Sequence, residues 1–406
     1  MFKFFAALIL LILPFTVLSQ NPSGMIIPQQ TAAKDTLGQK DLIEVFLDIT
    51  HFKAKKIKRE KGKKVYYSLL PFGQLPRGGT ALVTSTQAGF YLGDKKNTYL
   101  SSITFSPSTN LHGQYNVPFH SNIWSAENKW NFGGDIRYSY IPQDTWGPGG
   151  KQEESNKLRI NYSYVRFYVS ALKKIKPYLF AGMGYNLDYH INIRPENDSS
   201  SISKFTNYTY GTANNSNSFS SGITLNLLYD SRVNSINPLP GFFGNVILRL
   251  NPLFLGSNNA WYSLYVDTRK YIPFSRKGQN VLAVWSYAWT DFGSSSPYLD
   301  LPAVGDDPEQ RSGRGFYQRR YTGTTLLYLE TEYRRDISKS GLLGFVVFAN
   351  LNSVTEPDTH RFAYLHPGAG AGLRIKFNKN SGTNIGIDYG FSKGYSGIYI
   401  NLGEAF

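Results

Sequence analysis

The chain contains no cysteine among its 406 residues, so disulfide bonds and anchoring through a lipidated cysteine are both excluded. Charged residues are also scarce, at 17% of the chain, against roughly 25% in typical soluble domains. After the N-terminal residues, no stretch approaches the ~20 apolar residues that a membrane-spanning helix needs. Strands are therefore the elements with which such a chain would cross a membrane.

Residues 1–19 have the pattern of a cleaved secretory signal peptide. A lysine at position 3 precedes an apolar run from Phe4 to Leu18, and Ser19 is the small residue before an expected cut ahead of Gln20. We therefore expect export from the cytoplasm to the cell envelope, where no nucleic acid is available as a partner. The net charge of +15 then predicts basic residues that line a lumen or contact outer-membrane lipid and lipopolysaccharide.

Strand-like alternation with a period of two residues recurs from Lys64 to the end of the chain. In one clean segment Leu373, Ile375 and Phe377 alternate with Arg374 and Lys376. Charge on one face indicates water there, and apolar residues on the other face indicate lipid. About sixteen such segments predict an all-β fold, a transmembrane antiparallel β-barrel of about 16 strands over residues 64–406, in the outer membrane.

The connections between these segments alternate in length. Short ones, such as 93–97, 125–128, 173–176, 275–278, 337–340 and 378–381, fall between long ones at 142–156, 195–218, 252–260, 293–322 and 353–368. Outer-membrane barrels have short periplasmic turns and longer external loops. The tryptophans fall near proposed strand ends, which predicts interfacial belts: Trp124, Trp130, Trp146, Trp261, Trp285 and Trp289.

Three local features carry further expectations. Apolar residues change parity between Leu158 and Val169, which we interpret as a β-bulge. The last strand is expected to run through Gly397 to an aromatic end at Phe406 and to close the barrel. Pro71 is expected to truncate pairing in the first strand.

Residues 20–63 are not strand-like and are expected to form a periplasmic N-terminal segment. A short amphipathic helix is predicted after Asp41, and it would either plug the lumen or lie against the periplasmic rim. A basic run follows it, with two open interpretations, a solvated linker or an anchor for lipid phosphate or an acidic partner: Lys53, Lys55, Lys56, Lys58, Arg59, Lys61, Lys63 and Lys64.

The 293–322 loop contains Arg314-Gly315-Phe316, five strands before the end. This resembles the Arg-Gly-Phe/Tyr signature on the sixth external loop of the BamA/TamA superfamily, the bacterial surface antigen family. A second match lies in the predicted periplasmic turn after the eighth strand, at Asp230, Arg232, Asn234, Pro238 and Gly241. The resemblance covers residues 64–406.

The resemblance implies that Arg314 points into the lumen and pairs with carboxylates of the wall. Where the family often has Phe-x-Asp, this chain reads Phe348-Ala-Asn350, so the candidate partners are Glu330, Glu332 and Asp388. Only residues 20–63 are available for periplasmic POTRA domains, so we expect a member that lacks them.

The resemblance further implies a role in outer-membrane protein assembly, insertion or export, through a seam between the first and last strands. Client outer-membrane proteins or subunits of an envelope complex are the implied partners. The alternative is a passive channel or a structural subunit of an outer-membrane complex. Catalysis, cofactors and bound metals are not expected, because no histidine lies in a catalytic or metal-ligating motif: His51, His112, His120, His190, His360 and His366.

Overall fold

The computed structural model describes residues 40–50, 65–74, 80–110, 112–196, 217–232, 234, 236–238, 240–274, 280–293, 295–379 and 381–406. The expected signal peptide and the basic run lie outside these residues. The chain divides into units 1–38 and 39–406, and all described residues belong to the second. Within the described part, none of the helices has the length and apolarity to cross a membrane.

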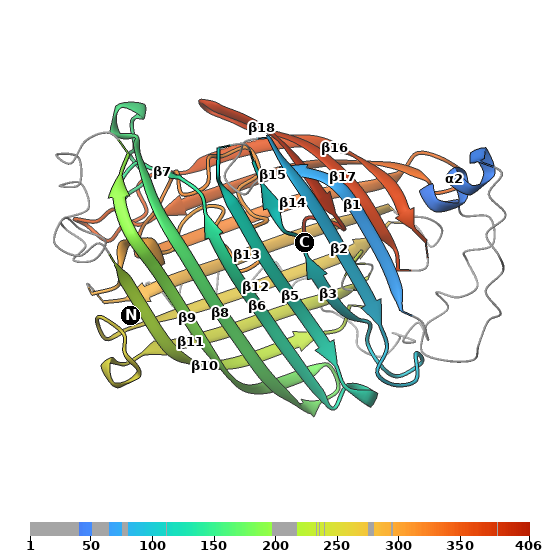
Figure 1. The fold of residues 1–406 in the computed structure, drawn as a ribbon, viewed down its shortest axis with the longest axis horizontal. Helices are drawn as coiled ribbons and strands as arrows, with labels where there is room; N and C mark the ends of the chain where they lie inside the picture. Colours follow the sequence, from blue (N-terminus) through green and yellow to red (C-terminus); the bar gives the residue numbers. More distant parts are fainter. Residues whose placement is uncertain are drawn as a thin grey trace. The chain divides into compact units, whose positions relative to one another are not determined.

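The 39–406 unit is built from antiparallel strands in one sheet (Figure 1). The strands are β1 (Tyr66–Gln74), β2 (Thr80–Phe90), β3 (Ser101–Phe105), β4 (Ser108–Thr109), β5 (Tyr115–Trp124), β6 (Trp130–Tyr140), β7 (Gln143–Thr145), β8 (Leu158–Lys176), β9 (Leu179–Pro195), β10 (Ser218–Asp230), β11 (Gly241–Asn251), β12 (Trp261–Pro273), β13 (Asn280–Phe292), β14 (Thr325–Asp336), β15 (Leu343–Val354), β16 (His366–Asn378), β17 (Thr383–Ser392) and β18 (Tyr395–Leu402).

Two pairs of these strands each fill one place in the barrel wall. β3 and β4 both lie between β2 and β5, and β6 and β7 pair with β8 in one continuous register. The described strands therefore occupy sixteen places, which confirms the predicted barrel of about 16 strands. Among the described residues, five short helices connect or flank them: α2 (Leu42–Thr50), η2 (Ala126–Asn128), η3 (Glu154–Asn156), η5 (Leu253–Leu255) and η6 (Tyr298–Asp300).

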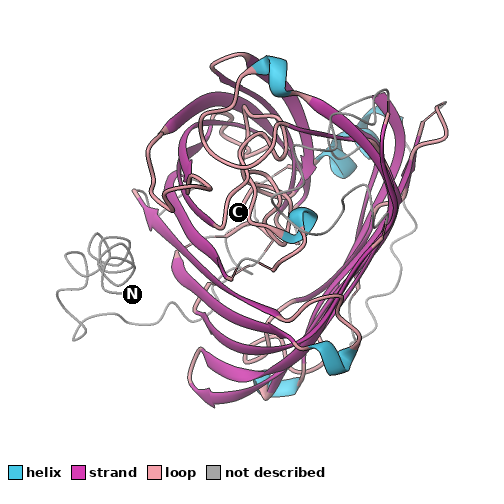
Figure 2. Cartoon of the chain, turned by 90° about the vertical axis from the view of Figure 1, so that its left-hand side faces the viewer, coloured by secondary structure: helices cyan, strands magenta, loops and turns pink. Residues whose placement is uncertain are grey.

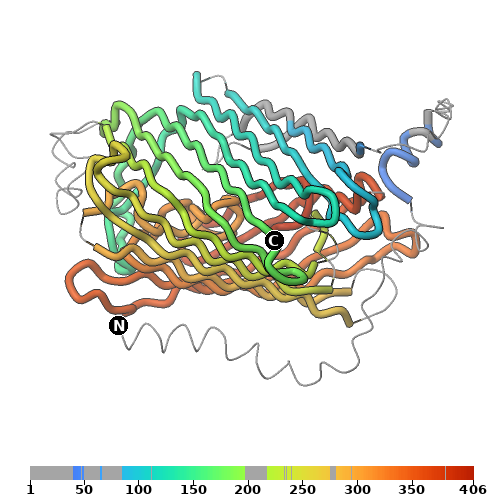
Figure 3. Tube along the Cα trace, turned by 90° about the horizontal axis from the view of Figure 1, so that it is seen from below, coloured from blue at the N-terminus to red at the C-terminus, as the bar shows by residue number. Residues whose placement is uncertain are grey.

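Neighbouring strands run steeply tilted around the wall, from β2 through to β17 (Figure 3). Consecutive places share a ladder of paired residues from β1–β2 to β17–β18. Between the described residues of β18 and β1 no such register exists, although the two strands lie side by side. The barrel is thus nearly closed, with a seam that lacks a ladder.

The two faces of the wall differ as the alternation predicts. On β12, every second residue from Trp261 to Tyr271 is buried toward the inside, and the residues between them are more exposed. Large apolar side chains are exposed on the outer face, among them Ile136, Tyr138, Phe167, Leu225, Val347, Leu373 and Ile387. Apolar residues outside and a mixed interior are the arrangement required of a barrel in lipid.

The parity change after Leu158 is not a bulge of that strand, so this interpretation was wrong. β8 keeps one register against β6 and β7. Its register with β9 shifts between Asn161 and Ser163, where the extra residue belongs to β9, and again near the end of β8, between Lys174 and Lys176. The inward residues at the start of β8 are apolar because they pack against η6 of the 293–322 loop, in a buried cluster of Leu158, Ile160, Tyr162, Tyr164, Ile193, Tyr298, Leu299 and Leu301.

The predicted tryptophan belts are also largely wrong. Trp124, Trp146, Trp261 and Trp285 are at most 4% exposed, and Trp130 alone among the six is an exposed side chain. The buried tryptophans fill the inside of the barrel, because period two assigns a residue to a face but does not reveal what occupies that face.

Both ends of the expected seam depart from the prediction. Pro71 does not truncate β1, which continues to Gln74; instead the β1–β2 register shifts between Leu70 and Phe72. The last strand ends at Leu402, and Gly403 then turns the chain inward with a φ of 91°. Phe406, expected to close the barrel, is instead 2% exposed inside it.

Candidate functional site: the arginine of the internal loop

The 293–322 loop, hereafter loop six, folds back into the barrel. Figure 2 shows loops inside the ring of strands, where the C-terminus is also marked. The side chain of Asp307 accepts hydrogen bonds from the main-chain nitrogens of Arg311 (3.1 Å) and Ser312 (2.8 Å) and so shapes the turn before Arg314. The next main-chain nitrogen, that of Gly313, donates to the Tyr328 hydroxyl at 3.0 Å.

Arg314 is 2% exposed and meets three carboxylates of the wall. Its Nη1 donates to Asp388 at 2.6 Å, and its Nη2 pairs with Glu330 and Glu332. These are the three partners that the sequence predicts. Burial alone would lower the pKa of the guanidinium, but the three carboxylates raise this pKa well above its ordinary value.

The residues at the family's Phe-x-Asp position also contact this arginine. The guanidinium carbon lies 3.7 Å from the centre of the Phe348 ring, a cation–π contact. The Asn350 amide donates to the main-chain oxygen of Arg314 at 2.8 Å. The amide therefore holds the loop backbone, and the carboxylates that neutralise the guanidinium come from β14 and β17 instead.

Arg314 belongs to a closed circuit of six alternating charges, hereafter the charge ring. After Arg314 and Glu332, Arg334 bonds Glu332 at 2.5 Å and lies 3.8 Å from Glu404. Arg374 then bonds Glu404 at 2.7 Å and Asp388 at 2.5 Å, and Asp388 returns to Arg314. The charge ring consists of Arg314, Glu332, Arg334, Glu404, Arg374 and Asp388.

The charge ring is buried, with side chains at most 4% exposed. Removing one partner from such a network leaves an uncompensated charge in a low-dielectric interior, at a cost of about 3–5 kcal/mol. Burial opposes ionisation of Glu404, but Arg374 and Arg334 hold the pKa of its carboxyl below the ordinary value. The ring therefore ties loop six to β14, β16, β17 and the residues after β18 as one unit.

Gly315 lets the loop backbone touch the wall. Its φ is 96°, and a Cβ there would lie 2.8 Å from the main-chain oxygen of Phe391 on β17. Its main-chain nitrogen donates to the Tyr399 hydroxyl at 2.9 Å. Phe316 is 6% exposed and lies so close to Gly368 that a Cβ on that glycine would meet its ring at 2.7 Å. All three residues of the motif thus contact the β16–β18 wall.

The tail after β18 completes the packing. Phe406 lies between Trp285 (ring centroids 5.1 Å apart) and Tyr271 (6.3 Å), and Arg334 donates to its main-chain oxygen at 2.8 Å. Arg311 of loop six donates to the main-chain oxygen of Glu404. The aromatic terminus predicted to end the closing strand is thus a core residue of the lumen. Gly397, also predicted for the closing strand, lies in β18 opposite Gly390.

The second motif lies in the turn between β10 and β11, which contacts the β16–β17 turn at the same end of the barrel. Arg232 forms a bidentate pair with Asp230, with both distances 2.9 Å. Asn234 accepts from the nitrogen of Ile236 at 2.8 Å and donates to the oxygen of Ser381, in the β16–β17 turn, at 2.9 Å. Asn234 therefore combines local capping with a long-range contact.

The two remaining residues of this motif act on the same turn. Pro238 is buried and lines the lumen cavity described below. A Cβ on Gly241 would lie 2.8 Å from the Cα of Arg232, so the chain passes itself closely here.

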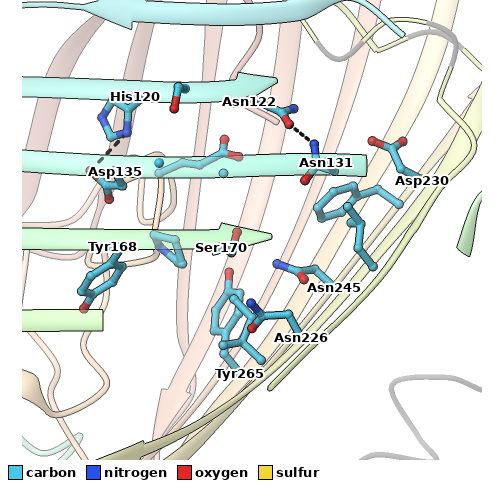
Figure 4. A pocket seen from close by; sticks show the side chains of 18 of the residues that line it. His120, Asn122, Asn131, Asp135, Tyr168, Ser170, Asn226, Asp230, Asn245 and Tyr265 are labelled. Atoms are coloured by element: carbon cyan, nitrogen blue, oxygen red, sulfur yellow. Dashed lines mark hydrogen bonds and ion pairs between the residues drawn. The ribbon is translucent and has the colours of Figure 1, made fainter. Parts of the chain in front are cut away.

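The other side of the lumen is open. A cavity of about 440 Å³, hereafter the chamber, lies mainly against β5, β6, β8 and β10–β12, and Glu404 and Phe406 of the tail also border it. Its wall is rich in neutral polar side chains, including Asn122, Asn131, Ser170, Asn226 and Asn245 (Figure 4). Pro308, Glu309 and Arg311 of loop six also line it. Loop six therefore fills one part of the lumen and borders the part left open.

Comparisons with known proteins fit this geometry. The model of the Omp85 superfamily domain matches residues 94–406. The chain belongs to the Omp85 superfamily. This Omp85 barrel lies in the bacterial outer membrane, and its short turns mark the periplasmic end. Omp85 barrels are assembly and transport proteins of that membrane rather than enzymes.

Solved structures with a similar fold include three barrels. BamA from Haemophilus ducreyi lacking POTRA domains 1–3 is 17% identical, with 84% of this chain and 68% of that one covered and a TM-score of 0.49. CdiB from Acinetobacter baumannii is 13% identical, with 84% of this chain and 66% of that one covered and a TM-score of 0.52. CdiB from Escherichia coli is 12% identical, with 84% of this chain and 62% of that one covered and a TM-score of 0.53. This chain spans about two thirds of their lengths. At these identities the two CdiB structures support the fold alone. A comparison with curated proteins gave no match.

Sequence reasoning missed part of the site in this Omp85 barrel. Arg334, Arg374 and Glu404 were not predicted as members of the charge ring. Arg334 and Arg374 could have been predicted, because the strand alternation places both side chains on the inward face. Arg334 follows Glu332 by two residues on the same strand, and Arg374 lies on the strand next to that of Asp388. Of the histidines, His366 stacks on Tyr321 at 3.6 Å, and the described residues hold no cluster of three metal-ligating side chains.

Proposed function

We propose that this barrel takes part in the insertion or export of outer-membrane polypeptides, with the β1–β18 seam as the edge that a client strand pairs with. The observation that carries the proposal is the missing ladder between β18 and β1, beside consecutive ladders throughout the rest of the wall. An unpaired strand edge presents free main-chain donors and acceptors, which an incoming strand satisfies by β-augmentation.

The charge ring supports this proposal by its position. β17 and the tail after β18 both hold loop six, through Asp388 and Glu404. Movement of β18 at the seam would therefore strain the ring, and loosening of loop six would release β18. We infer that Arg314 is the residue that couples the state of the lumen to the state of the seam.

A defined client tests the proposal. The full-length protein is reconstituted in vesicles, and an unfolded outer-membrane β-barrel protein is added. A photo-crosslinking residue replaces Ile398 on β18 or, as a matched control, Tyr138 on β6; the two side chains are 52% and 47% exposed. The proposal predicts client crosslinks at position 398 and few at 138, together with faster client folding than in empty vesicles.

Equal crosslinking at both positions, with no acceleration of client folding, would contradict the proposed function.

The alternative function, a passive channel or a structural subunit, is favoured by the chamber, which is open space in the lumen. Single-channel recordings separate the two. A channel predicts steady conductance without any client, whereas a lumen held shut by loop six predicts little conductance.

A further inference from the structure

Helix α2 presents an apolar face to its surroundings. Ile43, Phe46 and Ile49 are 39%, 64% and 74% exposed. At about 100° per residue these three side chains span an arc of roughly 120°, and the acidic residues Asp41, Glu44 and Asp48 lie on the other side of the helix. The helix is thus amphipathic, with its apolar side outward.

The acidic side fixes the helix to the barrel. Asp41 is 3% exposed; it accepts from the nitrogen of Glu44 at 2.9 Å, as an N-cap, and from the nitrogen of Lys379 at 3.0 Å. Glu44 pairs with the Lys379 side chain, and the nitrogen of Lys40 donates to Ser340 at 3.1 Å. Two neighbouring periplasmic turns therefore hold one side of α2, and the apolar side cannot rotate onto them.

The place where α2 is held borders the lipid-facing surface. The helix lies against β16, at the end of the barrel where the β14–β15 and β16–β17 turns lie (Figure 1). In those elements Ile337, Leu343 and Leu373 are outward side chains, 59%, 45% and 56% exposed. In an outer-membrane barrel such residues contact lipid. The apolar side of α2 therefore continues a surface that the bilayer already covers.

The sequence after α2 supports lipid as the occupant. It contains seven lysines and one arginine between residues 53 and 64, against one acidic residue. Basic segments beside an amphipathic helix are attracted to anionic headgroups. A partner protein with an acidic surface would match the basic run but not the apolar side chains of the helix itself.

We propose that α2 is an interfacial helix that binds the periplasmic leaflet of the outer membrane, with Ile43, Phe46 and Ile49 at the boundary between headgroups and acyl chains. It holds the periplasmic ends of β14–β17 at a fixed depth through Asp41 and Lys379. This inference does not depend on the proposed function, because a channel or a structural subunit would use the same anchor.

The cysteine-free chain allows a direct test with single labels. An environment-sensitive fluorophore is attached at Ile49→Cys or, as a matched control, at Asp48→Cys, whose native side chain is 68% exposed and pairs with the surface residue Lys40. The full-length protein is reconstituted in vesicles of phosphatidylethanolamine and phosphatidylglycerol. Quenching by iodide in the water and by a nitroxide on the lipid is then measured.

The proposal predicts that the label at position 49 is quenched by the lipid nitroxide and is about threefold or more less accessible to iodide than the label at 48. Adding Ile43→Ser and Phe46→Ser should make the label at position 49 accessible to quenching by iodide. Equal iodide quenching at 48 and 49 would overturn the proposal. Shielding from both quenchers would also overturn it, because it would place the face against protein, and so would an unaltered lipid signal in the serine variant.

Discussion

The two sides of the lumen are built by the same strand alternation but have opposite interiors. Along β12–β18 the inward residues are aromatic or charged, and loop six and Phe406 pack among them. Along β5–β11 many inward residues are asparagine, serine or threonine, and the chamber is left open. Buried charges persist only where matched partners exist. Loop six also reaches the β5–β11 side, where η6 packs on β8 and β9, so the two sides differ in how much of the inner wall the loop covers.

The largest effect is expected from Arg314→Ala, which removes the cation that Glu330, Glu332 and Asp388 share and leaves Glu332 and Asp388 only their pairs with Arg334 and Arg374. We expect loop six to lose about 3–5 kcal/mol of docking free energy and to become cleavable by protease while the barrel stays folded. The control is Arg361→Ala in the neighbouring external loop, where the side chain is exposed. Unchanged cleavage of loop six in Arg314→Ala would remove the proposed role of this arginine.

Phe406→Ala tests the aromatic part of the filled side. Loss of a buried phenylalanine side chain costs about 3–5 kcal/mol in protein cores, so the urea midpoint of unfolding in vesicles should fall. Phe167→Ala, on the outer face of β8 and 39% exposed, should lower the midpoint less. Equal shifts in the two variants would mean that Phe406 is not packed in the lumen.

Gly315→Ala tests the close contact between loop and wall. Its Cβ would clash with the backbone of Phe391 at a φ of 96°, so we expect a loss of about 1–3 kcal/mol. Gly394 is the matched control, because its φ is 81° but a Cβ would meet nothing within 4 Å. Gly394→Ala should therefore cost only the conformational strain. Thermal unfolding on gels that separate folded from unfolded barrel measures both, and equal losses would contradict the contact.

The outer part of loop six should respond to pH. Burial first, and the nearby Asp188, raise the pKa of Asp300 from 3.8 to about 7. Because the folded-state pKa is raised, the stability linked to its proton is fully present below the ordinary pKa and is lost as the pH rises through about 7. Reduced hydration inside the lumen opposes ionisation of Glu309, whose side chain is 51% exposed, but Arg269 and Arg311 lower its pKa to about 2, so it does not titrate in this window.

Protease cleavage of loop six should therefore increase between about pH 5 and about pH 8. Asp300→Asn should flatten this increase, whereas Glu309→Gln should leave it in place. An increase of the same size in Asp300→Asn would assign the pH response to another group.

The smallest effect is expected on the open side. Asn245 is half-buried on the chamber wall. Asn245→Ser should change the free energy of unfolding by less than about 0.5 kcal/mol and leave loop six protected from protease. A large change would show that the chamber wall is as tightly coupled to the loop as the filled side.

The sequence was sufficient for the wall and for the first contacts of Arg314. Period two assigns Glu330, Glu332 and Asp388 to the inner face, and a guanidinium brought inside requires such carboxylates. The helix after Asp41 was also predicted, and its position at the rim, one of two alternatives, is the one observed.

The remainder depends on contacts between distant parts of the chain. The inward turn at Gly403 reverses the face on which Phe406 would lie, and no local period encodes that turn. The apolar start of β8 was interpreted as a bulge because η6, which covers it, is far away in sequence. The buried tryptophans likewise pack on distant residues, such as Trp124 on Phe180 and Trp285 on Phe406. What fills a lumen is a tertiary property that alternation alone does not specify.

The most direct test is the distance between spin labels at Gln310→Cys in loop six and Lys339→Cys in the β14–β15 turn, measured by double electron–electron resonance in vesicles. We predict one narrow distance distribution in the otherwise unaltered protein and a broad one when Arg314→Ala is added. A broad distribution before that substitution, or an unchanged narrow one after it, would contradict a loop held inside the barrel by Arg314.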